Sequence, residues 1–266
     1  MYDLLVQNYV EDDDAMFRFD YSKEFLRWAL LPPGYNPDWL IGVRAGPKRK
    51  LFGCITGIPV TMYLNGREVN CAEINFLCVH KKLRAKRLAP ILIKEITRRV
   101  NRCDIWQAIY TAGATIPTPI TGAQYWHRSL NPQKLIDVGF SSLPSGKTMT
   151  KYVKENRLRS LQIPEMRPMV ESDLAMVTEL LNNHLRNFKV HIHFTLDEVA
   201  HFLLPRDKVV YSYCVDGPRD SDGKIPVIDF FSFYCLPSQI LRHPEHKILN
   251  VAYSFYNFVT PRSTQE

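Results

Sequence analysis

The stretch EINFLCVHKKLRAKR, residues 73–87, joins an apolar segment directly to a loop that is rich in positive charge. Between Ile74 and Val79 the apolar character is almost unbroken, which predicts a strand that is covered on both faces and central in its sheet. Residues 81–87 then hold five Lys or Arg in seven positions. A helix is predicted to follow, because Pro90 falls in a first turn and apolar residues recur at helical spacing, at Leu88, Ile91, Leu92, Ile96 and Val100.

The order of strand, cationic loop and helix predicts an anion-binding site. The free amide groups and the positive dipole end of a helix bind an anion, and flanking Lys or Arg side chains add charge. We expect a large phosphorylated cofactor to place its phosphates on residues 81–89 and its reactive end along the strand. The sequence contains neither GxGxxG nor GxxxxGK[ST], so neither a dinucleotide fold nor a P-loop is indicated.

The segments around this stretch predict an antiparallel meander. Residues 51–58, 59–64 and 67–71 are expected to be strands, and Asn65-Gly66 is expected to form a tight hairpin turn, since this pair accepts positive φ values. Downstream, residues 107–112 are predicted as a strand and residues 125–136 as a short helical stretch.

The second part of the chain repeats a similar order. We expect a strand at 166–170, an amphipathic helix from 174 to 181, and a helix opened by a capping box of Thr195 and Glu198. Strand-like runs follow at 209–215, 227–236 and 248–259. This order resembles the acyl-CoA-dependent acyltransferase superfamily called GNAT. The second copy lacks the crossover helix and final strand that residues 88–112 supply to the first, so we expect an uncovered sheet face and a chain that is part of a longer one.

Composition narrows the class of protein. The 266 residues are 45% hydrophobic with a net charge of +7, and residues 11–14 form an acidic run. Six cysteines are scattered without C-x-x-C pairs, which predicts reduced thiols and a cytoplasmic location. The first residues do not form a secretory leader, and no apolar run reaches the length of a membrane span, so no transmembrane segment is expected.

Six ordered motifs together resemble one family, the eukaryotic glycylpeptide N-myristoyltransferases, over essentially the whole chain. They are NYVEDDD (8–14), MFRFDYS (16–22), EINFLCVHKKLRAKR (73–87), YTAG (110–113), YWHRSLNP (125–132) and AYSFYN (252–257). The resemblance implies a mixed α+β, GNAT-like fold with two pseudo-symmetric halves around a saddle-shaped, mostly antiparallel sheet. Residues 1–160 would be the acyl-CoA-binding half, and residues 161–266 the start of an incomplete peptide-binding half.

The resemblance also implies a reaction. Myristoyl-CoA would be the cosubstrate, with no prosthetic group, and its acyl group would pass directly to the N-terminal glycine amine of a substrate protein. The backbone amides of Phe76 and Leu77, on a distorted strand, would form the oxyanion hole, and Asn75 and Thr111 would contact the amine as further catalytic residues. The acyl-CoA-binding residues implied by the resemblance are Phe76, Leu77, Cys78, Val79, Arg84, Ala85, Lys86, Arg87, Leu88 and Ala89.

Two positions depart from related patterns. Arg87 stands where the wider superfamily usually has glycine, and Ala85 stands where relatives often carry serine.

By the same resemblance, the peptide groove would be lined by Tyr9, Val10, Asp12, Asp13, Phe17, Phe19, Tyr21, Tyr125, His127 and Ser254. The acidic run would attract a basic residue downstream of the acceptor glycine.

The reaction needs a proton acceptor, because a glycine α-amine has a pKa of about 7.7 to 8 and is mostly protonated at pH 7. In the family this role is commonly given to the carboxylate at the enzyme's own C-terminus after a Leu-rich end. This sequence ends STQE, so Glu266 does not inherit the role and catalysis by the chain alone stays open.

Other classes of function are weaker. His184, His191, His193 and His201 lack cysteine or carboxylate partners at zinc spacing, so no metal is expected, and no G-x-S-x-G elbow marks a nucleophile. One alternative is a noncatalytic relative that binds acyl-CoA or peptide. Another is a nucleic-acid-binding module, based on the pI of about 9.0. The acidic run and the lack of aromatic residues in the basic loop argue against it, so no nucleic-acid partner is expected. Peripheral membrane or ribosome association is left open.

Overall fold

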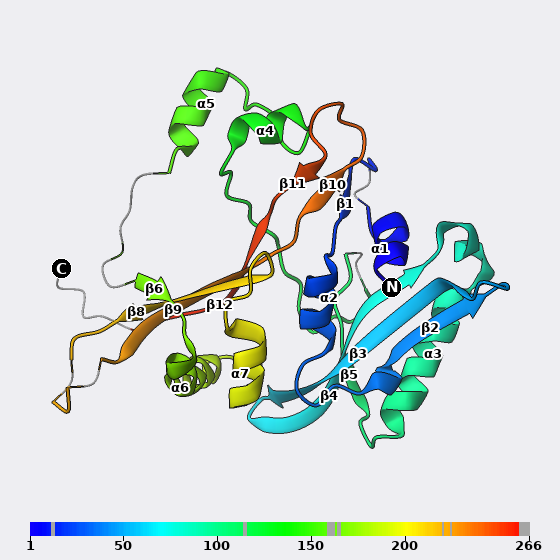
Figure 1. Ribbon diagram of the computed structural model, residues 1–266, viewed down its shortest axis with the longest axis horizontal. Coiled ribbons are helices and arrows are strands. Elements are labelled where there is room, and N and C mark those ends of the chain that lie inside the picture. Colours follow the sequence, from blue (N-terminus) through cyan, green and yellow to red (C-terminus); the bar gives the residue numbers. More distant parts are fainter. Residues whose placement is uncertain are drawn as a thin grey trace.

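The computed structural model of the chain describes residues 1–11, 14–113, 116–158, 163, 166–219, 221–223 and 225–260. Its strands form three sheets, with the orders β1-β10-β11, β2-β3-β4-β5 and β12-β9-β8-β6 (Figure 1). The fold class is therefore the predicted mixed, mostly antiparallel one. The strands divide among three sheets, where the resemblance implies one saddle-shaped sheet.

The first sheet contains β2 (Leu40–Ala45), β3 (Lys50–Leu64), β4 (Arg67–Val79) and β5 (Gln107–Ile109). Asn65 and Gly66 have φ values of 50° and 80° and join β3 to β4, which confirms the predicted hairpin turn. The predicted breaks before Pro59 and after Cys71 are wrong, since β3 and β4 run on through them. Pro59 is tolerated because β2 pairs with β3 only as far as Thr56, so β3 has β4 as its one partner there.

Strand β4 is central in the pairing order, as predicted, because it pairs with β3 on one side and lies parallel to β5 on the other. Helix α3 (Leu88–Asn101) packs along one face of this sheet (Figure 1). Leu92, Ile96 and Val100 are buried there, which confirms the predicted helix. Ile91 belongs to the predicted apolar stripe but is 58% exposed, since it lies on the outer side of the first turn.

Between the two large sheets the chain is mostly irregular. The short helix predicted at 125–136 begins only at Pro132, in α4 (Pro132–Asp137), because the residue before a proline is disfavoured in the helical region. Helix α5 (Met149–Asn156) follows, with the Thr148 side chain accepting a hydrogen bond from the Lys151 amide. Strand β5 ends at Ile109, three residues earlier than predicted.

The second large sheet contains β6 (Met166–Pro168), β8 (Val210–Asp216), β9 (Val227–Cys235) and β12 (Ala252–Val259). Helices α6 (Leu174–Leu185) and α7 (Leu196–Leu203) lie against it (Figure 1). The predicted capping box is confirmed: the Thr195 amide donates to Glu198 Oε2 at 2.8 Å, and the Glu198 amide donates to Thr195 Oγ1 at 3.3 Å. Four rings on β8 and β9 stack on one another and stay partly exposed, at Tyr211, Tyr213, Phe231 and Phe233.

The third sheet pairs a strand from near the N-terminus with two strands from the last 30 residues of the chain. Strand β1 (Phe17–Phe19) pairs with β10 (Ser238–Ile240), which pairs with β11 (Ile248–Leu249). The run predicted as one strand from 248 to 259 is therefore two strands in different sheets. Strand β7 (Val190–Ile192) also crosses over, since it extends the first sheet by pairing with the end of β3.

Two helices close to the N-terminus, α1 (Tyr2–Asn8) and α2 (Lys23–Leu30), complete the core. Their apolar residues form one buried cluster with Cys54 and Phe76 of the first sheet and Val210 of the second. The Trp28 Nε1 donates to the Phe202 carbonyl at 3.3 Å. Short single turns occur at Pro37–Trp39 (η1), Lys81–Lys86 (η2) and Glu171–Asp173 (η3).

Candidate active site

The site is built around an irregularity in β4. Cys54 pairs with Cys78 and Thr56 pairs with Asn75, so that Ile55 alone stands opposite both Phe76 and Leu77. This two-against-one arrangement is a β-bulge, and Phe76 has a φ of 54°, a left-handed conformation that is unusual for a bulky residue. The Thr56 hydroxyl donates to the Asn75 carbonyl at 2.8 Å and the Cys54 thiol to the Phe76 carbonyl at 3.4 Å. The predicted strand distortion at this point is confirmed.

Aromatic side chains hold the bulge in place. The Phe76 ring is 8% exposed, and its centroid lies 5.1 Å from that of Tyr21 and 6.1 Å from that of Tyr9. Burial raises the pKa of Tyr9 to about 12 and also raises the pKa of Tyr21, so both hydroxyls stay neutral at physiological pH. Leu77 faces outward and is 37% exposed, which corrects the expectation that both faces of this strand are covered.

A cavity of about 630 Å³ lies between the bulge and the cationic loop. One wall is the end of α1 and the residues after it, from Asn8 to Glu11. The other wall consists of Leu77, Cys78, Val79, Arg84, Arg87, Ala89 and Pro90. The residues expected to bind acyl-CoA that do not line this cavity are Phe76, Ala85, Lys86 and Leu88, and of these Ala85 and Lys86 are exposed in η2.

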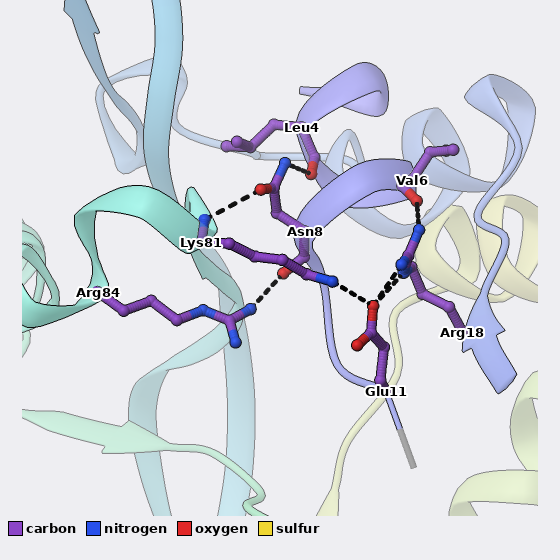
Figure 2. Close-up of polar contacts among 7 residues, drawn as sticks. All are labelled: Leu4, Val6, Asn8, Glu11, Arg18, Lys81 and Arg84. Carbon is purple, nitrogen blue, oxygen red and sulfur yellow. Dashed lines mark hydrogen bonds and ion pairs between the residues drawn. The ribbon is translucent and has the colours of Figure 1, made fainter. Parts of the chain in front are cut away.

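The cationic loop is tied to the opposite wall by a set of polar contacts (Figure 2). The Lys81 amide donates to Asn8 Oδ1 at 3.0 Å, and Arg84 Nη2 donates to the Asn8 carbonyl at 2.7 Å. Lys81 Nζ donates to Glu11 Oε1 at 2.6 Å, and the same carboxylate oxygen accepts from Arg18 Nε at 2.8 Å. The hydrogen bond from Lys81, aided by Arg18, holds the pKa of Glu11 below its ordinary value. These contacts join the loop to the end of α1 and to the residues just after it.

Two further cavities meet at the bulge. One of about 530 Å³ lies between α3 and strands β4 and β5, and it is lined mostly by apolar residues with Asn75, Phe76, Leu77 and Thr111 at one end. The other, of about 400 Å³, shares Asn75, Phe76 and Thr111 and adds Glu73. Asn75 Nδ2 donates to Glu73 Oε1 at 2.7 Å. The four residues expected to be catalytic are thus brought together.

The residues expected to contact peptide form two aromatic groups. In the first, ring contacts run from Phe19 and Tyr9 to Tyr21, whose ring contacts Phe25. They continue through Tyr234 and Tyr253 to Tyr125, which is 77% exposed. In the second, Phe17 and His127 both pack on Phe140. Val10 lines the first two cavities, Ser254 is exposed on β12, and Asp12 and Asp13 lie outside the described residues.

Comparison with known proteins identifies the family. Residues 1–123 match the family model "Myristoyl-CoA:protein N-myristoyltransferase, N-terminal domain", and residues 137–266 match the C-terminal domain model of the same family. The chain belongs to the N-myristoyltransferase family. It is 55% identical over 264 residues to glycylpeptide N-tetradecanoyltransferase 1 of Arabidopsis thaliana, and 49% identical over 261 residues to the Plasmodium falciparum glycylpeptide N-tetradecanoyltransferase.

The fold agrees with that of solved N-myristoyltransferases. The crystal structure of Saccharomyces cerevisiae N-myristoyltransferase with bound myristoyl-CoA superposes with a TM-score of 0.91 at 45% identity, covering 97% of this chain and 62% of that one. The alignments with the two enzymes above cover 99% and 98% of this chain, but 60% and 62% of those enzymes. The chain therefore spans about three fifths of the length of these N-myristoyltransferases.

Several residues that shape this candidate site were not predicted from the sequence. Glu73 lies within a quoted motif, but its contact with Asn75 depends on the strand geometry and is not visible in spacing. Asn8, Glu11 and Arg18 lie within quoted motifs too, yet Asn8 and Glu11 contact Lys81 some 70 residues away in sequence, and Arg18 joins them through Glu11. The signal available in the sequence was an acidic run at residues 11–14 and a cluster of cations at 81–87, and charge clusters of this kind are common on protein surfaces.

The described part of the chain holds no group of three or more His, Cys, Asp or Glu placed to bind a metal. His191 instead stacks on Tyr63, with the ring planes 4° apart. The six cysteines are unpaired, and burial raises the pKa of Cys54 to about 12 and of Cys78 to about 11. None of the described helices is long and apolar enough to cross a membrane.

Proposed function

We propose that this chain provides the acyl-CoA site and part of the peptide site of a glycylpeptide N-myristoyltransferase, and that it transfers myristoyl from myristoyl-CoA to an N-terminal glycine. The observation that carries the proposal is the β-bulge at Phe76 and Leu77, which lies where three cavities meet and beside the cationic loop. The names of the Arabidopsis and Plasmodium relatives support the same reaction.

The phosphates of CoA would bind at the loop that precedes α3. Arg84, Lys86 and Arg87 carry positive charge at that point, and the first turn of α3 adds free amide groups. The pantetheine arm would run past Cys78 and Val79 in the cavity of about 630 Å³, toward the bulge. The acyl chain would lie in the apolar cavity between α3 and β4, which shares Leu77 with the first.

The chemistry would take place at the bulge. The amides of Phe76 and Leu77 would donate to the thioester oxygen, whose negative charge develops as the glycine amine attacks the carbonyl carbon. The carbon–sulfur bond then breaks and the amide bond is complete, while the proton lost by the amine nitrogen neutralises the departing CoA thiolate, so that CoA leaves as the free thiol. Asn75 Nδ2 is engaged by Glu73, which leaves the Asn75 side-chain oxygen to accept a hydrogen bond from the amine, with Thr111 as a second polar neighbour.

The peptide would lie along the aromatic groups that connect Tyr9 and Tyr21 with Tyr125, and Phe17 with His127. Such rings bury apolar area while fixing an extended backbone beside them.

We further propose that the chain is organised as halves 1–160 and 161–266, supported by the start of the second large sheet at Met166. Six unpaired cysteines support a reducing, cytoplasmic location. Association with a ribosome or a membrane surface stays a prediction from the resemblance.

Binding without transfer is the second candidate, favoured because the two carboxylates described in the cavity with Asn75 and Thr111 already accept hydrogen bonds: Glu73 accepts from Asn75, and Glu198 from the amide and hydroxyl of Thr195. A transfer assay with myristoyl-CoA and a peptide that begins with glycine separates the two candidates, with the same peptide beginning with N-methylated glycine as control. Titrations with myristoyl-CoA and with its dephospho form are run in parallel. Binding with transfer supports the enzyme, binding alone supports the second candidate, and no binding contradicts both.

A further inference from the structure

The cations of the loop before α3 do not all serve the same purpose. Lys81 and Arg84 point back to the end of α1, where Asn8 and Glu11 accept their hydrogen bonds (Figure 2). Lys82, Lys86 and Arg87 have no such partner among the side chains that the structure describes. The loop therefore holds two cations that are braced against the segment at the end of α1 and three that are not.

The bracing is carried by a buried asparagine. Asn8 is 4% exposed, and its side chain donates to the Leu4 carbonyl at 3.0 Å and accepts from the Lys81 amide at 3.0 Å. Its carbonyl accepts from Arg84. Removing the Asn8 side chain would take this partner from the Leu4 carbonyl and from the Lys81 amide, whereas the Arg84 contact is made to the Asn8 backbone. One residue thus holds the loop at both its backbone and its Arg84 side chain.

Glu11 adds a charged tie beside it. Its side chain is 19% exposed and forms ion pairs with both Lys81 and Arg18. Arg18 Nη1 also donates to the Val6 carbonyl at 2.8 Å. Because Asn8 and Glu11 form one wall of the cavity and the loop forms the other, these contacts set the distance between the walls. They also keep the Lys81 ammonium at the Glu11 carboxylate.

We propose that Asn8 and Glu11 are positioning residues for the phosphate-binding loop: they fix its distance from α1 and retain Lys81, and so set the affinity for the phosphates of the acyl-CoA. This inference rests on the proposed function, because it names what shapes that same cofactor site. It predicts a defect that depends on the phosphates of the ligand and not on its acyl chain.

The first test uses Asn8→Ala and two probes, myristoyl-CoA and S-myristoylpantetheine, which has the same acyl chain and thioester but no phosphates. Asn182→Ala is the matched control, because Asn182 is 7% exposed and its side chain likewise bonds one carbonyl and one amide, both of Phe194. We expect Asn8→Ala to raise the Kd for myristoyl-CoA roughly tenfold while the Kd for the pantetheine thioester changes less than twofold. Asn182→Ala is expected to change neither.

The second test is a double-mutant cycle on folded variants that keep Asn8. Glu11→Gln and Lys81→Met are each expected to weaken myristoyl-CoA, and their effects are expected to be non-additive, since each removes the same tie. Lys82→Met removes an equal charge from the same loop, and its effect is expected to add to that of Glu11→Gln. Circular dichroism and urea unfolding confirm that each variant is folded.

Equal weakening of both probes by Asn8→Ala, unchanged affinity for myristoyl-CoA, or additive effects of Glu11→Gln and Lys81→Met would overturn the inference. The failure of the proposed function has a different signature. If the unmodified chain does not bind myristoyl-CoA, the proposed function and the inference both fall. If the unmodified chain binds it more tightly than the pantetheine thioester and the variants show no selective effect, the inference alone falls.

Discussion

The two large sheets each contain a β-bulge, in which two residues of one strand stand opposite a single residue of its partner. The residue opposite the bulge differs between the two sheets. In the second sheet, Phe255 and Tyr256 of β12 stand opposite Ser232 of β9. The Ser232 hydroxyl donates to the Tyr256 carbonyl at 2.8 Å and accepts from the Tyr256 amide at 3.0 Å, while the Ser232 amide donates to Asn257 Oδ1. In the first sheet the residue opposite the bulge is Ile55, whose side chain has no polar atom.

The difference lies in whether a side chain bonds the backbone at the bulge. A buried backbone amide costs free energy if it has no partner, and the second sheet meets this requirement internally with a serine that is 0% exposed. In the first sheet no side chain among the described residues accepts from the Phe76 or Leu77 amide. Under the proposed function, the first bulge would bind a developing oxyanion, whereas the second bulge serves packing.

The most direct test places a serine opposite the first bulge, as in the second sheet. Ile55→Ser places a hydroxyl opposite Phe76 and Leu77, where it would compete with the thioester oxygen for their amides. We expect kcat for myristoyl transfer to fall by ~10²-fold relative to Ile55→Ala, the loss typical of one oxyanion donor. Ile55→Ala is the control because it creates a cavity of similar size at this buried position without a hydroxyl. Equal rates for the two variants would show that these amides do not stabilise the reaction.

The reverse change removes the serine from the second bulge. Ser232→Ala leaves the Tyr256 amide and carbonyl without their side-chain partner, and we expect the free energy of unfolding to fall by about 1–3 kcal/mol. Urea denaturation measures this loss. Affinity for myristoyl-CoA should stay unchanged, since Ser232 lines none of the three cavities described above. An unchanged unfolding midpoint would mean that the second bulge is satisfied in another way.

Backbone strain can also be tested at Arg87, the residue just before α3. Its φ of 53° lies in the left-handed region, which glycine adopts without cost. Arg87→Gly is expected to change stability by less than about 1 kcal/mol, because the relief of strain offsets the extra freedom of the unfolded chain. Arg87→Ala keeps the strain while removing the same charge, so it is expected to be the less stable of the two. Thermal unfolding of both variants provides the measurement, and equal Tm values would contradict the strain argument.

The smallest expected effect is on pH dependence. Since the pKa of Glu11 is lowered in the folded chain, its tie to Lys81 contributes stability above the ordinary pKa of a glutamate. That contribution is lost as the pH falls through the lowered pKa of the folded state. The difference in unfolding free energy between the unmodified chain and Glu11→Gln is therefore expected to shrink as pH falls from 6 toward 3. A difference that stays constant over this range would exclude a charged tie.

Much of the first sheet and of the cofactor site could be predicted from local signals. The Asn-Gly turn, the apolar run of β4 and the helical period of α3 each depend on neighbours in sequence, and so does the capping box of α7. The resemblance placed Asn75, Phe76, Leu77 and Thr111 in one site, and the structure brings these four together. The cations at 81–87 were visible as a group.

What could not be predicted depends on contacts between distant segments. The division of residues 248–259 between two sheets follows from the pairing of β10 with β1, which no local pattern encodes. The roles of Lys81 and Arg84 could not be told apart from those of Lys86 and Arg87, because their partners lie on α1 and just after it. The continuity of β3 through Pro59 depends on where β2 ends.

The pairing of β1 with β10 has a consequence for synthesis of the protein on the ribosome. Phe17 pairs with Ile240, so one of the first strands to be made waits for a partner more than 200 residues later. At 5–20 residues per second, that interval lasts roughly 10–40 s. During this time Arg18 has Glu11 nearby but β1 has no sheet to join, and the N-terminal segment is exposed to chaperones and to competing contacts. Strand β1 is thus among the first parts of the chain to be synthesised and among the last to find its partner.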